Sequence, residues 1–385
     1  MERGVRAQTS DAIHSPRIDR VAGSDARLLA LIRQLIEVSR DGLPHMYRTE
    51  ERCFAHTLRR RGEGGVELLG TSLRYSAIVL RGAQWLDQEG QRRVLGGESA
   101  AEFCDRLVRG FDEPSNLGDQ ALVTWNAASL GHTETRRLVE SLGARVESQP
   151  GAYTVEVAWA LSALTAGGEL AGDAAHRACS RLLAALPGQL GVFPHRIDGR
   201  GGAFRSHVAC FADQVYPIQA LARFHAVFGN DPPLAAANQC ADTICRQQGP
   251  LGEWWWHYDV RTGGVIEGYP VYSVHQDAMA PMALLDLAEA GGVDHSDEIR
   301  RGLLWMQRVP VVGSSIIDEE NRLIWRKLGR REPGKLVRQV RAATTSLATG
   351  FRLGMLDAVF PPVQVDWESR PYHLGWVLDA WLGHL

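Results

Sequence analysis

The strongest constraint on the fold is an alternation between two kinds of helix. Apolar helices rich in Ala, Leu and Trp are predicted to begin near Thr71, Asp119, Thr154, Asp213, Asp277, Thr344 and Tyr372. Helices with one charged face alternate with them over 99–109, 134–142, 173–186, 234–247 and 296–307. A helix that is apolar all round is buried on both sides, whereas a helix with an apolar stripe lies at the surface. The pattern predicts an all-α fold, an α/α toroid of six or seven helical hairpins with an inner and an outer ring, although a helical solenoid would give the same signal.

The rhythm of helices covers most of the 385 residues, so a single closed domain over residues 24–385 is predicted. Residues 1–23 are polar and are predicted to form a flexible N-terminal arm. Three long connections rich in Gly and aromatic residues, 189–211, 249–274 and 309–335, each lead from an outer helix to the next inner helix. They are therefore expected at one mouth of the toroid as short β-hairpin-like loops, where function is usually carried.

Composition excludes several classes of protein. The net charge of −3, without a basic stripe, argues against a nucleic-acid partner. No apolar run is long enough for a transmembrane segment, and the N-terminal residues lack the apolar core of a secretory signal. The six cysteines form no CxxC pair and show no metal-ligand spacing, so a reducing, cytoplasmic location without a metal or other cofactor is predicted. The oligomeric state is left open.

One short motif suggests a family. Residues 248–254, from Gln248 to Trp254, read Q-x-x-x-G-x-W, and 189–193 form a weaker copy one hairpin earlier. The first motif resembles the QW motif of the squalene and oxidosqualene cyclases, whose toroid is shared with the protein prenyltransferases. The resemblance implies a terpenoid-cyclase-like fold. The DxDD acid motif of those cyclases, the DDxxD motif for a metal-bound diphosphate and a recognisable prenyltransferase zinc set are absent.

Carboxylates recur where inner helices begin. Asp119, Asp213 and Asp277 occupy equivalent positions, and Glu156 lies on a fourth inner helix. Because the starts of inner helices converge at one mouth, these groups could face one cavity, where mutual repulsion would raise at least one pKa and supply an acid. The alternative is that each Asp only caps its helix, since Asp is a favoured N-cap residue.

Histidine and arginine near these positions are the next candidates. His275 lies two residues before Asp277, and His207 lies on the matching approach to Asp213; either could act as a base. His195, His257 and His373 are weaker candidates. Arg205 and Arg74 could bind an anionic group.

Aromatic rings concentrate in the second long connection. The predicted substrate-binding set comprises Trp255, Trp256, Tyr258, Tyr269 and Tyr272, with Tyr216 on an inner helix and with His207 and Arg205 in the preceding connection. Such rings could stabilise a carbocation, stack on a sugar, or simply wedge the hairpin onto its neighbours. Three adjacent Trp residues cannot all face one way, so only some are expected to line a pocket.

The favoured hypothesis is an enzyme that converts an isoprenoid or similar apolar substrate by acid-initiated cyclisation or rearrangement. Asp277 or Asp213 would be the acid and His275 its partner, with Asp119 as a third catalytic candidate. The alternative is a carbohydrate-active enzyme, a hydrolase, lyase or epimerase, that uses the same carboxylates and His. A non-catalytic helical binding scaffold is the second alternative. The expected partner is a small-molecule substrate, with peripheral membrane contact if that substrate is a lipid.

Overall fold

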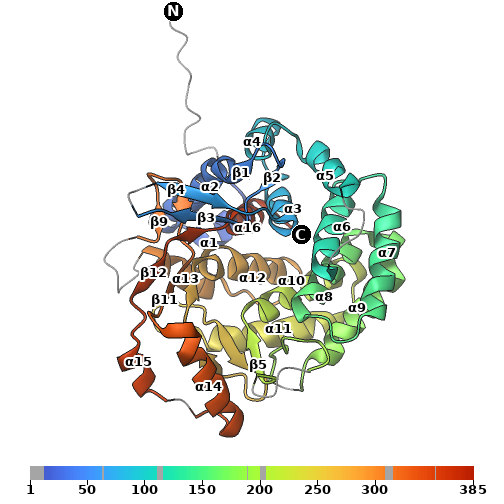
Figure 1. The fold of residues 1–385 in the computed structure, drawn as a ribbon. Coiled ribbons are helices and arrows are strands. Elements are labelled where there is room, and N and C mark those ends of the chain that lie inside the picture. The colour runs from blue at the N-terminus through green and yellow to red at the C-terminus, as the bar shows by residue number, and fades with distance from the viewer. Residues whose placement is uncertain are drawn as a thin grey trace, which may run out of the picture.

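A closed ring of apolar helices forms the centre of the molecule (Figure 1). The computed structural model describes residues 13–62, 65–110, 116–188, 190–199, 205–307, 315–351 and 353–385. Each inner helix packs beside the next, and the last packs beside the first, so the ring closes. In ring order the inner helices are α3 (Leu73–Ala83), α6 (Leu117–Ser129), α8 (Thr154–Ala166), α10 (Ala212–Phe228), α12 (Ala280–Glu289) and α16 (Pro371–Leu382).

Amphipathic helices surround this ring and complete the α/α toroid. They bury one stripe against the inner ring and expose charged residues on the other side, as the sequence pattern predicts. The outer helices are α2 (Ala26–Gly42), α5 (Ala100–Arg109), α7 (Thr135–Ser148), α9 (Gly172–Ala185), α11 (Asp231–Arg246) and α13 (Ser296–Gln307). The described residues therefore contain six inner helices rather than seven, and the predicted fold class is confirmed.

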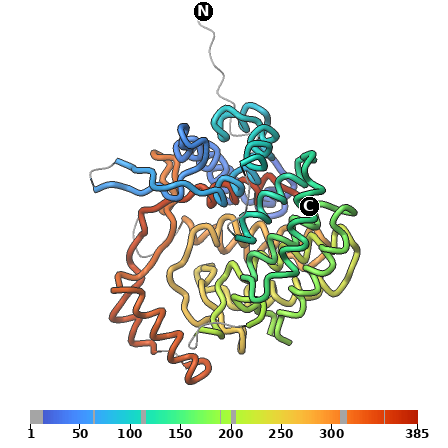
Figure 2. Tube along the Cα trace, turned by 45° about the vertical axis from the view of Figure 1, so that its right-hand side comes forward, coloured from blue at the N-terminus to red at the C-terminus, as the bar shows by residue number. Residues whose placement is uncertain are grey.

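Four further helices lie outside the two rings: α1 (Pro16–Ala22), α4 (Gln88–Val94), α14 (Leu336–Leu347) and α15 (Met355–Val359). The inner helix predicted to begin near Thr344 is wrong, because α14 already ends at Leu347 and packs against strand β7 (Val265–Glu267). Both views place α14 and α15 beside the ring, not in it (Figures 1 and 2). No helix of the described residues is long and apolar enough to cross a membrane.

The predicted N-terminal arm, residues 1–23, is partly helical. Residues 1–12 lie outside the described part, but Ser15 caps α1 and Pro16 occupies its first turn, both favourable signals for a helix start. Helix α1 contacts α2, α13 and α16, and its Arg17 side chain is 1% exposed. Residues 16–22 therefore belong to the folded body.

Short antiparallel sheets gather where the inner helices begin. The strands beyond β7 are β1 (Tyr47–Arg48), β2 (Cys53–Phe54), β3 (Thr57–Arg60), β4 (Val66–Leu69), β5 (Val208–Cys210), β6 (His257–Asp259), β8 (Val271–Tyr272), β9 (Ile317–Asp318), β10 (Leu323–Ile324), β11 (Lys327–Gly329), β12 (Gln364–Asp366) and β13 (Glu368–Ser369). They pair as β13-β3-β4, β12-β11-β8, β5-β6-β7, β1-β2 and β10-β9. The hairpins predicted in 249–274 and 309–335 are present as β6-β7 and β9-β10. Strands β4, β5, β8 and β13 each lead into an inner helix, so this end of the ring is the predicted mouth.

The ring closes through a contact between glycine residues. A Cβ atom added to Gly82 of α3 would lie 2.1 Å from the carbonyl oxygen of Gly375 in α16, and one added to Gly375 would lie 2.9 Å from the carbonyl oxygen of Ile78. The two backbones can approach this closely only because neither residue carries a side chain.

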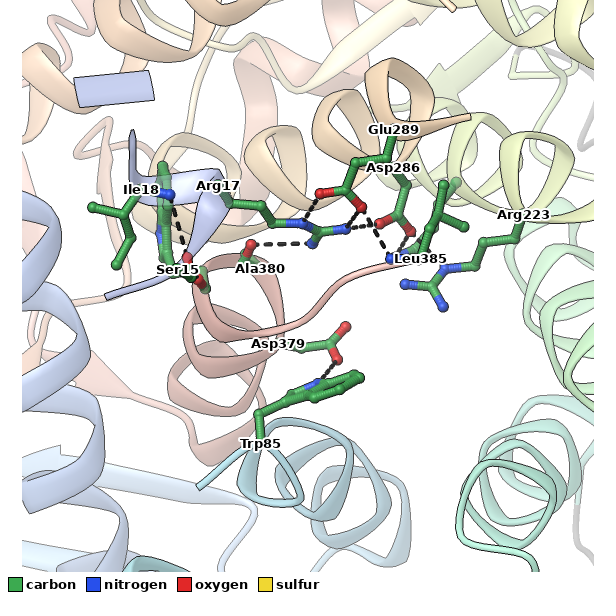
Figure 3. A network of polar contacts seen from close by, with 12 residues as sticks. Ser15, Arg17, Ile18, Trp85, Arg223, Asp286, Glu289, Asp379, Ala380 and Leu385 are labelled. Atoms are coloured by element: carbon green, nitrogen blue, oxygen red, sulfur yellow. Dashed lines mark hydrogen bonds and ion pairs between the residues drawn. The ribbon is translucent and has the colours of Figure 1, made fainter. Parts of the chain in front are cut away.

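At the end of the ring opposite the mouth, buried charges join α1, α10 and α12 (Figure 3). Asp286 is fully buried and accepts hydrogen bonds from Arg17, from Gln219 at 3.0 Å and from Arg223 at 2.5 Å. Arg17 also donates to Glu289 at 2.6 Å and to the Ala380 carbonyl at 3.1 Å. Despite burial, Arg223 and Arg17 hold the pKa of Asp286 below its usual value.

Gly82→Ala is predicted to destabilise the protein, although Ala is favoured over Gly in helices by about 1 kcal/mol. Forcing the α3–α16 contact apart should lower the free energy of unfolding by about 1–3 kcal/mol, the usual cost of overpacking. The measurement is chemical denaturation followed by circular dichroism. The matched control is Gly172→Ala in α9, where the nearest atom to an added Cβ lies at 3.9 Å; equal effects of the two variants would contradict the prediction.

Arg17→Ala should lower the free energy of unfolding by about 3–5 kcal/mol, because it leaves the buried Asp286 and its neighbour Glu289 short of a positive partner. Its control is Arg20→Ala on the same helix, which removes a partly exposed ion pair to Asp294 at 3.2 Å. That control should change the free energy by less than about 1 kcal/mol. Urea unfolding of both variants checks the difference.

Candidate active site at the mouth of the inner ring

Each inner helix contributes a polar or aromatic side chain to the mouth in its first turns. Just before α12, a π-helical turn, η4 (His275–Met279), leads into the helix. Residues of chemical interest at these starts are Arg74 and Tyr75 on α3, Asp119 on α6, Glu156 and Trp159 on α8, Asp213 and Tyr216 on α10, His275 and Asp277 on η4, and Tyr372 and His373 on α16.

Arginine and carboxylates gather on the side formed by α3, α6 and α8. Arg74 Nε donates to Asp119 Oδ1 at 2.7 Å, and Arg74 Nη2 lies 3.8 Å from Glu156 Oε1. Burial raises the pKa of Glu156, and the negative charge of Asp119 adds to the effect, while Arg74 opposes it. This side of the mouth therefore combines an ionised pair with a carboxyl group that can hold a proton at higher pH than usual.

On α10, Asp213 orients a histidine from the preceding loop. His195 Nδ1 lies 3.0 Å from Asp213 Oδ2, which also accepts a hydrogen bond from the Cys210 backbone N–H at 2.7 Å. Asp213 is fully buried, whereas the His195 side chain is 52% exposed. The hydrogen bond to Asp213 raises the pKa of His195 against the effect of burial. Because Nδ1 is bonded to Asp213, Nε2 is the nitrogen left for a ligand.

A second His–Asp pair lies deeper, between η4 and α16. His373 Nε2 lies 2.8 Å from Asp277 Oδ1, and both side chains are almost fully buried. Trp381 Nε1 donates to the Asp277 carbonyl at 2.8 Å. Burial raises the pKa of Asp277, while the charge of His373 opposes this. Asp277 is thus shielded from direct contact with a ligand.

Two further histidines lie between these pairs. The His275 ring packs between Phe211, at 4.5 Å, and Tyr272, at 5.0 Å, and its buried Nδ1 makes no hydrogen bond to the protein. Burial lowers the pKa of His275 to about 3. His257 stacks on Trp256 at 4.0 Å, and burial, aided by nearby arginines, lowers its pKa well below the usual value. Burial therefore favours the neutral form of both rings.

Aromatic rings and arginines connect the two sides of the mouth. Trp159 contacts Tyr216 at 4.9 Å, Tyr75 contacts Tyr372 at 4.8 Å, and Trp256 contacts Tyr272 at 5.6 Å. The guanidinium groups lie over these rings or bond to them: Arg74 over Trp159, Arg326 over Tyr272, Arg338 over Trp256, and Arg370 bonded to the Tyr75 hydroxyl. The mouth is thus lined by polar and cationic groups as well as by rings.

Several predicted pairings are corrected by this geometry. His275 does not contact the Asp277 carboxylate, which bonds to His373, because the turn of η4 directs the two side chains apart. His207 does not contact Asp213; its Nε2 lies 2.9 Å from Thr345 Oγ1 beneath α14.

The alternative that each Asp is an N-cap also fails in detail. Asn116 caps α6 and accepts from the Asp119 N–H, while Phe211 and Val274 precede α10 and η4 without a side-chain cap. Each Asp lies inside the first turn of its helix.

The predicted substrate-binding residues divide into two groups. Trp256, Tyr272 and Tyr216 lie at the mouth, and Arg205 lies close enough to His257 to lower its pKa. Tyr258 is fully buried, like its neighbours His257 and Asp259 in β6. Trp255 and Tyr269 pack against each other at 5.9 Å, and Arg330 covers Tyr269. Their roles in binding remain predictions.

Sequence reasoning missed Tyr75, Trp159, Tyr372 and the arginines Arg326, Arg338 and Arg370. The available signal was the run Arg370-Pro371-Tyr372-His373 at the start of the last apolar helix. Arg326 reaches the mouth from the segment between β10 and β11, and Arg338 reaches it from α14; no local sequence pattern reveals where these segments pack.

The structural neighbours of the chain are enzymes that act on sugars. An unsaturated glucuronyl hydrolase specific for heparin superposes with a TM-score of 0.58 at 12% identity, over 91% of this chain and 95% of that one. A sugar epimerase from a ruminal bacterium gives 0.60 at 11% identity (91% and 98%), and a D-mannose isomerase gives 0.57 at 13% identity (92% and 97%). These likenesses establish the α/α toroid fold. No protein-family model and no curated protein sequence matches the chain.

The favoured functional hypothesis, cyclisation of an isoprenoid, is therefore wrong. The structural neighbours described above are sugar enzymes and not isoprenoid cyclases, and the mouth is lined by arginines and carboxylates instead of a purely apolar wall. The turn 248–254 has a packing role that needs no cyclase: Gln248 Nε2 donates to the Gly252 carbonyl at 3.0 Å, and Trp254 is fully buried against Phe211. Gln189, in the weaker copy, lies outside the described residues. The membrane contact expected for a lipid substrate loses its basis.

Asp213→Asn should lower the pKa of His195, because it removes the main cause of the upward shift. A raised folded-state pKa stabilises the protein below the unfolded value of about 6.5, and this contribution disappears as pH rises through the folded pKa. The variant should lose this extra stability at low pH. An NMR titration of the histidine ring protons measures the pKa, with His225 at the far end of α10 as internal control. An unchanged His195 pKa would disprove the assignment.

Proposed function

We propose that the protein is a carbohydrate-active enzyme that moves protons on a sugar by histidine catalysis, as in an isomerase or epimerase. The observation that carries the proposal is the row of histidines His195, His257, His275 and His373 at the mouth, two of them held by buried aspartates. The sugar enzymes with the same fold add support at the level of class.

The proposed chemistry follows from the different environments of the rings. His275 has a buried Nδ1 without a hydrogen bond to the protein, and this nitrogen can take a proton from a carbon next to a carbonyl group. Burial keeps the ring unprotonated before the substrate binds, but it also makes the ring a weaker base. His195, with its raised pKa and partly exposed ring, suits the acid that protonates the sugar oxygen. Asp213 and Asp277 act as positioning residues, because both are fully buried and bonded to imidazoles.

Unpaired polar atoms at the mouth fit a polyhydroxylated ligand. Within the described residues, buried atoms without a hydrogen bond to the protein include Trp159 Nε1, Arg326 Nε and Arg370 Nε. Buried polar groups normally have a partner, and sugar hydroxyls can accept from each of these donors.

His275→Ala and His195→Ala should each reduce turnover by about 10²–10⁴-fold, the usual contribution of a general acid or base. The assay incubates a panel of free aldoses, ketoses and reducing disaccharides in D₂O and follows deuterium entry at the carbon next to the carbonyl by NMR. The matched control is His225→Ala, which removes a histidine at the opposite end of α10 and should retain activity. If no sugar of the panel exchanges or changes with the unmodified protein, the isomerase proposal is rejected.

A hydrolase or lyase is the second candidate, and the raised pKa of Glu156 beside Asp119 is the observation that favours it. A protonated carboxyl next to an ionised one is the arrangement that glycoside cleavage requires. Glu156→Gln separates the candidates: it should abolish release of sugar from unsaturated uronyl oligosaccharides if the protein is a hydrolase, and it should leave deuterium exchange catalysed if the histidines do the chemistry.

A further inference from the structure

A cluster of potential metal ligands lies between the outer helices α11 and α13, where the proposed function has no use for them. Cys245, His295 and Glu298 each offer one ligand atom, and these atoms lie within 4.8 Å of one another. We infer that Cys245 Sγ, His295 Nδ1 and a Glu298 carboxylate oxygen bind one Zn²⁺ ion, with water as the fourth ligand. This site goes beyond the proposed activity and does not rest on it.

Helix geometry explains how the ligands come together. Asp242 and Cys245 are three residues apart on α11, and His295 and Glu298 are three residues apart at the start of α13, so each pair shares a face of its helix. Asp242 Oδ1 lies 3.5 Å from His295 Nε2, which shows that the two faces meet. The ligands come from two segments about fifty residues apart, so the sequence shows no short spacing motif typical of a metal site.

The distances suit a tetrahedral ion. His295 Nδ1 lies 3.6 Å from Glu298 Oε2. Bond lengths of about 2.0–2.3 Å and tetrahedral angles place neighbouring Zn²⁺ ligands roughly 3.5 Å apart. Thiolate, imidazole and carboxylate together favour Zn²⁺ over the hard cations Mg²⁺ and Ca²⁺, which take oxygen ligands.

The other nitrogen of His295 also has the partner that a metal-bound histidine needs. A histidine that binds a metal through one nitrogen normally directs the other toward a carboxylate, and His295 Nε2 faces Asp242. This Nε2 is buried without a hydrogen bond to the protein, and the His295 side chain is only 8% exposed. Glu298 Oε1 is taken by Arg301 Nη2 at 3.0 Å, which leaves Oε2 for the ion.

The thiol of Cys245 lies beside the Glu298 carboxylate, and a bound cation would neutralise both groups. Cys245 is almost fully buried, and a carboxylate oxygen of Glu298 lies within 4.8 Å of its thiol. On binding, the thiol releases its proton to solvent, and the thiolate and Glu298 then balance the two positive charges of the ion. The other His–Cys–Asp group of the described residues, His195, Cys210 and Asp213, differs because Asp213 is already bonded by His195 and belongs to the mouth.

The ion would fix the turn that begins the mouth loop. Gln248 Nε2 donates to the Glu298 carbonyl at 2.9 Å, and its Oε1 accepts from Arg301 at 2.9 Å. A bond between α11 and α13 would therefore anchor residues 248–254 and, through Trp254, the approach to η4. The inferred role is that of a structural staple outside the active site.

The test measures Zn²⁺ bound by the full chain after dialysis against zinc chloride, by elemental mass spectrometry. The unmodified protein should retain one equivalent. Cys245→Ala should lose it, and Asp242→Asn should bind about 10–100-fold more weakly. The matched control is Cys179→Ala, which removes a buried cysteine of outer helix α9 far from the cluster and should keep the ion.

A second measurement guards against misfolding of the cysteine variant. Co²⁺ bound in place of Zn²⁺ should give a thiolate-to-metal charge-transfer band, and the partly exposed Glu298→Gln should weaken binding without loss of the folded circular dichroism spectrum. Absence of retained metal in the unmodified protein, a metal content unaffected by Cys245→Ala, or Co²⁺ binding without the thiolate band would each overturn the proposal. None of these outcomes bears on sugar turnover, so the two proposals fail independently.

Discussion

Closure of the inner ring is the constraint on which the rest of the structure depends. The chain must bring α16, its last helix, against α3, its first inner helix, and the backbones meet through Gly82 and Gly375. Apolar packing alone does not select this arrangement, because many pairs of helices could pack against each other. Closing the ring of six hairpins requires α16 and α3 to meet in one particular alignment. Arg17 helps to select that register, since it joins α1 to Asp286 on α12 and to the carbonyl of Ala380 on α16.

Once the ring is closed, its two ends differ for a simple reason. The inner helices α3, α10, α12 and α16 begin after long connections that contain short strands, and all six inner helices end near short connections at the other side. The mouth therefore gathers side chains from helix starts, from the segments around the β-strands and from α14, whereas the opposite end, among the described residues, gathers helix ends, α1 and the C-terminal residues. Helix starts also present unpaired N–H groups and a positive dipole, which favour carboxylates such as Asp119 and Glu156.

The sequence revealed the fold better than it revealed the site. The pattern of apolar residues predicted the two rings, because inner helices such as α8 and α16 are buried on all sides and are therefore apolar along most of their length. It placed Asp213 and Asp277 correctly at helix starts, yet it assigned them the wrong histidines. His195 and His373 reach these carboxylates from segments 18 and 96 residues away, and such contacts follow from the closed ring, not from spacing along the chain. Spacing along the chain could not predict the position of Arg338 either, because this residue lies on α14, outside the ring.

The buried aspartates show why one end is suited to stability and the other to chemistry. Asp286 is compensated by Arg17 and Arg223, which stay protonated at any physiological pH, and its own pKa is lowered. Asp213 and Asp277 are compensated only by histidines, whose charge depends on pH. An arginine partner locks a buried carboxylate into a permanent ion pair. A histidine partner carries a proton that it can give up, and His195, whose side chain is 52% exposed, is the one placed to exchange that proton with a substrate.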